Sequence, residues 1–202
     1  MKNKLLNAVR SHIRQSLHIE AYNKWCEEWV KFKTSGATDF VGLPDREFDV
    51  DPEDLNEGDI LMLSPNLIGQ GVRPFMVMVL AQADSDSAAK LWGTNFSCAV
   101  VTPFSPLSKP AFSYELSIDE DRILQLWNTR CVPPNHLKMS WRMGQADQET
   151  VDAAYDVHLH YEGKPLSKEL SNRVFVPEHG DDLKLHTEYY NSECELADNL
   201  EL

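Results

Sequence analysis

The stretch GDILMLSPNLIGQGVRPFMVMVL, residues 58–80, carries the first indication of the fold. A short β-like run at residues 59–64 leads into a loop rich in glycine, proline and asparagine at residues 65–72, and an apolar run follows at residues 73–80. Such loop residues mark turns, and a short apolar run between turn signals is typical of a strand buried on both faces. We therefore expect two strands joined by a loop.

Further β-like runs follow the first two along the chain. They lie at residues 92–97, 98–101, 111–118 and 122–127, with a polar surface loop expected at residues 83–89. Five or six short strands separated by loops favour a closed or half-closed barrel over a βαβ unit. The sequence therefore predicts an α+β fold, in which a small β-barrel has a helical extension before it and helices after it.

The segments that precede the expected barrel are helical and then acidic. In residues 3–33 apolar side chains recur every three to four positions, which predicts helix, and Trp25 and Trp29 lie one turn apart on the expected core face. Residues 39–57 are acidic, hold two prolines and lack periodicity. This pattern indicates a connector over the surface or a segment that faces a partner.

Two helices are expected towards the C-terminus. Asp147 is a suitable N-cap ahead of apolar residues at helical spacing, and residues 155–161 fit either a helix or an alternating strand. Residues 185–200 are expected to form a short amphipathic helix. The expected division of the chain is an N-terminal helical extension at 1–34, an acidic connector at 35–57, a barrel domain at 58–165 and an acidic C-terminal tail or helix at 166–202.

Composition limits the classes of protein to which the chain can belong. Hydrophobic residues make up 42% and charged residues 25% of the 202 residues, as in ordinary globular proteins, and no apolar run is long enough to cross a bilayer. The four cysteines are scattered and the N-terminus lacks the features of a secretory signal. We therefore expect a cytoplasmic protein with reduced thiols, no membrane contact, no metal and no other cofactor.

The net charge of −13 is concentrated in two blocks. Residues 34–60 hold nine acidic residues and one arginine, and residues 151–202 hold twelve acidic residues and four basic ones. Binding of nucleic acid through its phosphates requires positive potential, which the field of the whole chain opposes. A protein partner with a basic surface would suit both acidic blocks.

Taken in order, the motifs of residues 58–163 resemble those of the MazF/PemK family of toxin ribonucleases, which are built on an SH3-like barrel. The resemblance rests on a Gly58-Asp59-Ile60 strand, a loop ending in Arg73-Pro74 before an apolar strand, a Thr102-Pro103-Phe104-Ser105 segment, a further strand at 123–130, and a Leu137 to Gly144 motif ahead of the closing helix. It covers about half of the chain.

The resemblance implies a homodimeric endoribonuclease that cleaves single-stranded RNA without a metal. Arg73 would be the catalytic cation and Ser105 a catalytic hydrogen-bond donor at the phosphate, because a guanidinium offers two parallel hydrogen bonds to phosphate oxygens. The residues that would bind RNA are Gln70, Trp127, Asn128 and Arg130. Trp127 is also a candidate core residue, and it could stack on bases only if it were exposed.

Two of these positions leave the activity open. Gln70 stands where members of the family usually carry a glutamate, and residues 126–128 offer no acidic residue on the late strand, where some members use one in proton transfer. The amides of Gln70 and Asn128 cannot transfer a proton near neutral pH. One alternative is a catalytically inactive protein-binding or regulatory module on the same fold. Another is a self-inhibited barrel, in which residues 39–57 or 178–201 fill the groove.

Overall fold

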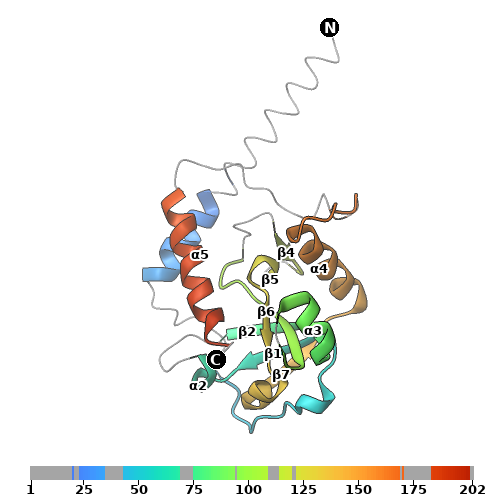
Figure 1. The fold of residues 1–202 in the computed structure, drawn as a ribbon. Helices are drawn as coiled ribbons and strands as arrows, with labels where there is room; N and C mark the ends of the chain where they lie inside the picture. Colours follow the sequence, from blue (N-terminus) through green and yellow to red (C-terminus); the bar gives the residue numbers. More distant parts are fainter. Residues whose placement is uncertain are drawn as a thin grey trace.

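The computed structural model describes residue 20 and residues 23–34, 43–68, 75–93, 95–108, 114–119, 122–168, 170 and 183–200. This part of the chain is α+β, as the sequence predicts (Figure 1). The strands are β1 Asp59–Leu63, β2 Phe75–Ala83, β3 Cys98–Pro103, β4 Glu115–Ser117, β5 Ile123–Gln125, β6 Arg130–Val132 and β7 Ser140–Gln145. The α-helices are α2 Pro65–Ile68, α3 Ser85–Trp92, α4 Gln148–Tyr161 and α5 Leu183–Asp198, and the 3-10 helices are η1 Pro52–Asp54, η2 Leu126–Asn128 and η3 Pro134–Met139. Residues 23–34 are also helical.

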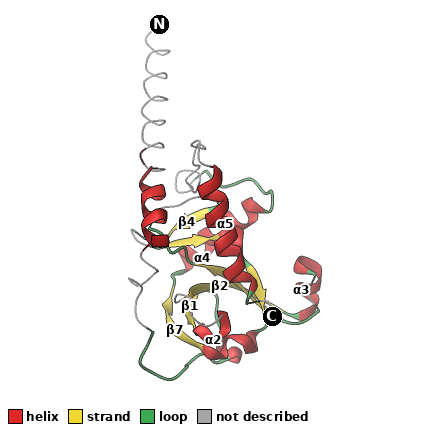
Figure 2. Ribbon diagram, turned by 90° about the vertical axis from the view of Figure 1, so that its left-hand side faces the viewer, coloured by secondary structure: helices red, strands yellow, loops and turns green. Residues whose placement is uncertain are grey.

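The larger sheet has five antiparallel strands in the order β6-β3-β2-β1-β7. Strands β1, β2 and β3 form a meander, and β7 returns after η3 to pair with β1. Register shifts between Ile60 and Leu61 and between Val79 and Ala81 bend these strands, and the sheet is strongly curled (Figure 2).

The sheet is nevertheless not a closed barrel, so of the two expected forms, closed and half-closed, the closed one is wrong. In the described residues β6 pairs with β3 and β7 with β1, and these two outer strands do not pair with each other. Strands β4 and β5 form a separate two-stranded sheet. The outer edge of β7 is instead covered by the acidic connector, because the Asp49 N–H donates to the Ser140 carbonyl and the Arg142 N–H donates to the Asp49 carboxylate. A covered edge needs no further strand.

Both faces of the larger sheet are buried, which confirms the expectation for the apolar run of β2. On one face Met78 and Leu80 lie in a cluster with side chains of α4. On the other face Val77 and Val79 lie in a cluster with side chains of η3 and of the end of α5. Alternate residues of β2 therefore contribute to two cores, and the strand shows no alternation of polar and apolar residues.

A third cluster joins the two ends of the described chain. Trp25 and Trp29, from helical residues 23–34, pack with Trp127 and with Tyr189 of α5. The two N-terminal tryptophans are 1% and 2% exposed, which confirms that they face the core. Figure 1 shows the N-terminal helical segment beside α5.

Helices α3 and α4 each begin at an aspartate that caps the helix. The Asp147 carboxylate accepts a hydrogen bond from the Thr150 N–H, as predicted, and α4 continues to Tyr161 without becoming a strand. Helix α3 was not predicted: Asp84 caps it in the same way, and Gly93 ends it in the left-handed conformation. Among the helices of the described residues, none combines the length and the hydrophobicity needed to cross a bilayer.

Candidate functional site

The six residues that the sequence analysis assigned to RNA chemistry fall into two groups. Gln70 and Arg73 lie outside the described residues, and their roles stay predictions. The other four are described, and each of them contacts α5: Ser105, Trp127, Asn128 and Arg130. The structure therefore brings these four residues to one face of the molecule, which we call the α5-covered face.

Ser105 follows β3 and belongs to a hydrogen-bond network. Its Oγ lies 2.8 Å from the Tyr189 hydroxyl and accepts a hydrogen bond from the Leu107 N–H. The Tyr189 hydroxyl donates its proton to Glu115 Oε1, 3.2 Å away, so that Ser105 is the donor to Tyr189. The Ser105 hydroxyl, which was predicted to donate a hydrogen bond to a phosphate, thus forms its hydrogen bonds within the protein.

Gln125 connects this tyrosine to a second carboxylate. Its Nε2 donates to the Tyr189 hydroxyl at 2.8 Å and to Glu193 Oε2 at 2.9 Å. Asn128 Nδ2 donates to Gln125 Oε1 at 3.2 Å and to the Glu193 carbonyl at 3.1 Å, whereas Asn128 Oδ1 is buried without a hydrogen bond. Gln125, Asn128 and Glu193 are each 0% exposed. Asn128 therefore joins η2 to α5, and its side chain is not accessible to RNA in this arrangement.

Trp127 and Arg130 are covered by the same helix. Trp127 is 7% exposed, its Nε1 donates to Glu115 Oε1 at 3.1 Å, and its ring stacks on Tyr190 with centroids 4.9 Å apart. The Arg130 side chain is 15% exposed and donates to Asp198 Oδ1 at 2.8 Å. Trp127 is thus a core residue, which was the alternative expectation for it.

One side of α5 supplies the buried contacts. Tyr189, Glu193 and Ala197 recur every four residues and are each 0% exposed, so they form a single row on the helix. The sequence analysis expected this helix but did not single out Tyr189 or Glu193, nor the strand residues Glu115 and Gln125. A glutamate within an otherwise apolar helical row was the signal that could have indicated a buried polar contact.

The charge of the α5-covered face is unsuited to a phosphate. Glu115 and Glu193 are 1% and 0% exposed, and both carboxylates are linked to Tyr189 through the hydrogen bonds above. An anion brought beside Ser105 would meet two carboxylates in an environment that screens charge poorly. While α5 is in place, this face does not offer a site for the RNA backbone.

Because of Tyr189, we expect the free energy of unfolding of the protein to fall at alkaline pH. Burial raises the pKa of Tyr189 well above the 10.0 of a free tyrosine, and the charges of Glu115 and Glu193 raise it further. Above pH 10 the unfolded chain loses this proton while the folded chain keeps it, so the free energy of unfolding should fall by up to about 1.4 kcal/mol per pH unit. Urea unfolding between about pH 9 and pH 11 should show this slope in the wild type and in the exposed control Tyr155→Phe. An equal slope in Tyr189→Phe would contradict the assignment.

The two histidines near the end of α4 contact different backbone carbonyl oxygens. His158 Nδ1 lies 3.3 Å from the Leu126 carbonyl oxygen, and His160 Nδ1 lies 2.7 Å from that of Lys164. Within the residues that the structure describes, no three histidine, cysteine, aspartate or glutamate side chains are grouped so that they could hold a metal ion.

Comparisons with known proteins identify no relative. No protein-family model, no curated protein and no solved structure matches the chain significantly. The function has to be inferred from the arrangement of the residues themselves.

Proposed function

We propose that this protein is a protein-binding module on a divergent MazF/PemK-like scaffold, and that it recognises a partner with a basic surface. The observation that carries the proposal is the occupation of the expected RNA face by α5. Each of the four described residues of that face either forms a hydrogen bond with α5 or stacks its ring on α5. A ribonuclease needs these side chains to be available to its substrate.

The strand order supports the scaffold. A meander β1-β2-β3, followed by a last strand that returns to β1 after a 3-10 helix, is compatible with a small, half-open barrel of the SH3-like type. The Gly58-Asp59-Ile60 motif lies at the start of β1, and the Thr102–Ser105 motif lies at the end of β3. These positions support the proposal, because the resemblance implies a strand at the first motif and the end of a strand at the second.

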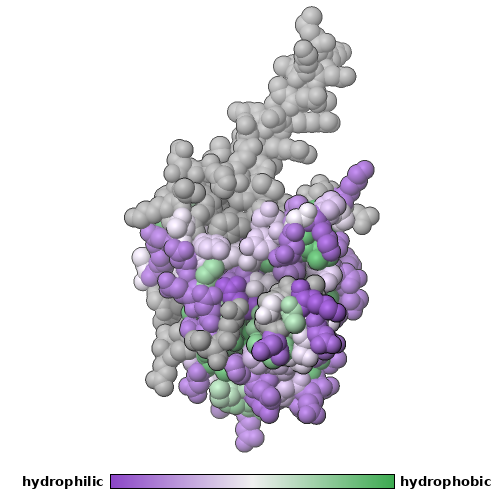
Figure 3. Space-filling view, in the orientation of Figure 1, coloured by the Kyte–Doolittle hydropathy of each residue, from purple (hydrophilic) through white to green (hydrophobic). Residues whose placement is uncertain are grey.

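The exposed charge supports a basic partner. Residues 43–59 hold eight acidic residues and one arginine. Four of the acidic side chains are exposed and make no hydrogen bond or ion pair within the described residues: Asp45, Glu47, Glu53 and Glu57. Figure 3 shows mostly hydrophilic residues on the described part of the face in view, with apolar residues in small areas. Charge complementarity therefore suits recognition here better than a large apolar patch does.

Affinity capture at two salt concentrations tests the proposal. With the full chain as bait, a basic protein should be retained at about 50 mM salt and released at about 500 mM, because salt screens exposed charges. A bait that carries Asp45→Asn, Glu47→Gln and Glu53→Gln should retain markedly less of it, and no RNA should be retained. Cleavage or binding of single-stranded RNA by the intact chain in EDTA would contradict the proposal, as would the absence of any retained protein at low salt.

A latent ribonuclease is the second candidate function. It is favoured by one observation, that four expected RNA-facing residues are gathered beneath a single helix. In that case α5 acts as an internal inhibitor, and its release would uncover Ser105 and free Arg130 from Asp198. Separation of α5 from the rest of the chain distinguishes the two candidates.

A further inference from the structure

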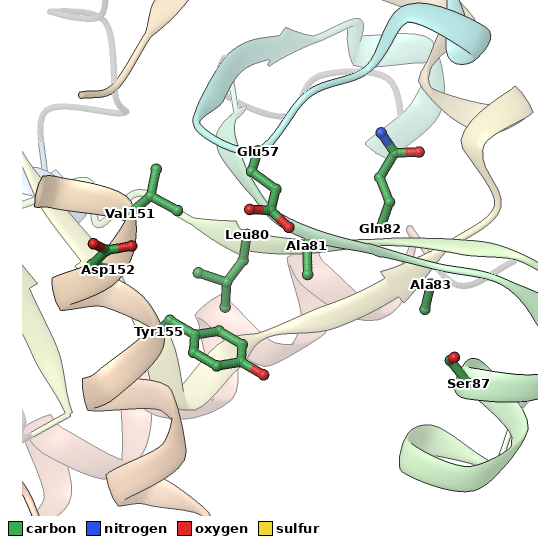
Figure 4. A pocket seen from close by; sticks show the side chains of 9 residues that line it. All are labelled: Glu57, Leu80, Ala81, Gln82, Ala83, Ser87, Val151, Asp152 and Tyr155. Carbon is green, nitrogen blue, oxygen red and sulfur yellow. The ribbon is translucent and has the colours of Figure 1, made fainter. Parts of the chain in front are cut away.

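A pocket of about 380 Å³ lies between β2, α3 and α4 (Figure 4). Its size is at the lower end of the range of pockets that hold small ligands or single side chains. The lining residues are Glu57, Leu80, Ala81, Gln82, Ala83, Ser87, Val151, Asp152 and Tyr155. None of them belongs to the α5-covered face, so the pocket is a separate site.

The floor of the pocket is apolar and one wall is aromatic. Leu80, Ala83 and Val151 are 2%, 8% and 4% exposed. Tyr155 is 45% exposed, and its ring extends from α4 across the pocket towards α3 (Figure 4). An accessible ring above an apolar floor can pack against the stem of a long side chain and present its face to a cation.

The rim of the pocket carries two carboxylates. The side chain of Glu57 points over Leu80 and Ala81 (Figure 4), and it makes no hydrogen bond or ion pair within the described residues. Asp152 accepts one hydrogen bond, from Gln148 Nε2 at 2.9 Å, which leaves further acceptor capacity. None of the lining residues is basic. A cation that enters from solvent would therefore meet negative charge without a competing positive side chain on the lining.

We propose that this pocket binds an arginine side chain presented by the protein partner, an inference that rests on the proposed function. The apolar floor suits the methylene stem, the Tyr155 ring suits the flat guanidinium, and Glu57 accepts its hydrogen bonds. A lysine ammonium is more strongly hydrated and has no plane to stack, so it fits less well. Glu57 is also the last exposed acid of the segment 43–57, so a basic partner that lies along this segment reaches the pocket.

Binding of a labelled peptide to the full chain tests the site. The probe is a fluorescein-labelled peptide of alternating glycine and arginine, followed by anisotropy at about 10 mM salt, where exposed charges are little screened. Tyr155→Ala and Glu57→Gln should each raise the Kd about three- to fivefold. The same peptide with lysine in place of arginine should bind about threefold more weakly to the wild type, and the glutamine peptide should not bind. Equal binding of the arginine and lysine peptides would overturn the assignment to arginine.

Two aspartates one turn apart on α4 provide a matched control. Asp152 lines the pocket, whereas Asp156 is exposed outside it, and each change to asparagine removes the same charge from the same helix. Asp152→Asn should raise the Kd about threefold, whereas Asp156→Asn should raise it less than about 1.5-fold. All the altered side chains are exposed, so an unchanged melting temperature should show that each variant folds. Equal losses for the two aspartates, or unchanged binding by Tyr155→Ala, would overturn the pocket assignment.

The pocket and the proposed function fail in different ways. If a captured basic partner binds the Tyr155→Ala bait as tightly as the wild-type bait, the pocket is overturned and the protein-binding module stands. If the intact chain binds RNA, the proposed protein-binding module is overturned. The pocket is still supported in that case if binding of the arginine peptide depends on Tyr155 and Asp152.

Discussion

Replacing Tyr189 with alanine is expected to lower the free energy of unfolding by about 4 kcal/mol. Tyr189 is 0% exposed, and its ring packs edge-on against Trp25 and Trp29 with centroids 5.7 and 5.2 Å apart. Truncation removes these contacts and leaves a cavity that the surrounding helices can only partly fill. It also leaves Ser105 and Gln125 without the hydroxyl that they share. Because a domain is only marginally stable, this loss is a large part of the total.

Two further variants distinguish the contribution of the Tyr189 ring to stability from that of its hydroxyl and from that of a neighbouring residue of α5. Tyr189→Phe keeps the ring and should cost about 1–2 kcal/mol, because the buried polar partners lose a hydrogen bond. Tyr190→Ala removes the neighbouring, 44% exposed tyrosine and should cost about 1 kcal/mol through its stacking on Trp127. Urea unfolding followed by tryptophan fluorescence measures all three variants. A loss for Tyr189→Ala no larger than that for Tyr190→Ala would contradict the role of Tyr189 as the centre of this cluster.

The sequence analysis predicted correctly most of those helices and strands that are determined by residues close together in the sequence. The turn-bounded runs became β1, β2 and β3, the Asp147 cap begins α4, and the amphipathic C-terminal stretch became α5. Helix α3 had equally local signals, since Asp84 and Gly93 are a suitable N-cap and C-cap, but the small polar residues between them favoured a loop. The run at residues 122–127 gave a shorter strand than expected, because the chain turns into η2 after Gln125.

Closure of the sheet and coverage of the site depend on distant residues, and neither could be predicted from local patterns. Whether β7 meets another strand depends on the connector that binds Ser140 and Arg142 from more than ninety positions away. In the same way, Ser105 and Asn128 were both predicted to face RNA, but nothing in their own segments indicates a helix over them. Helical periodicity shows that α5 has a buried row and leaves open the surface on which that row packs.

Cleavage of the chain between α4 and α5 is expected to turn α5 into a dissociable element. A protease site can be placed within residues 171–182, which connect the two helices outside the described part. The intact chain holds α5 at a high effective concentration, and cleavage removes this advantage. The melting temperature of the cleaved protein should therefore fall on dilution, by about 10 °C or more once α5 dissociates, because the third cluster then loses Tyr189. The uncleaved protein should show no such dependence on concentration.

RNA binding by the cleaved protein then separates the two candidate functions. Dissociation of α5 removes Glu193 and Asp198 from the face, so that Arg130 loses its ion pair with Asp198 while Glu115 stays on the same face as Ser105. For a protein-binding module we expect no binding of a labelled single-stranded RNA at any dilution, since one buried carboxylate still opposes a phosphate and the chain as a whole remains acidic. RNA binding that appears on dilution and is lost in Arg130→Ala would instead establish the latent ribonuclease face. Adding back a synthetic peptide of residues 183–200 should then suppress it, because α5 and RNA would compete for the same side chains.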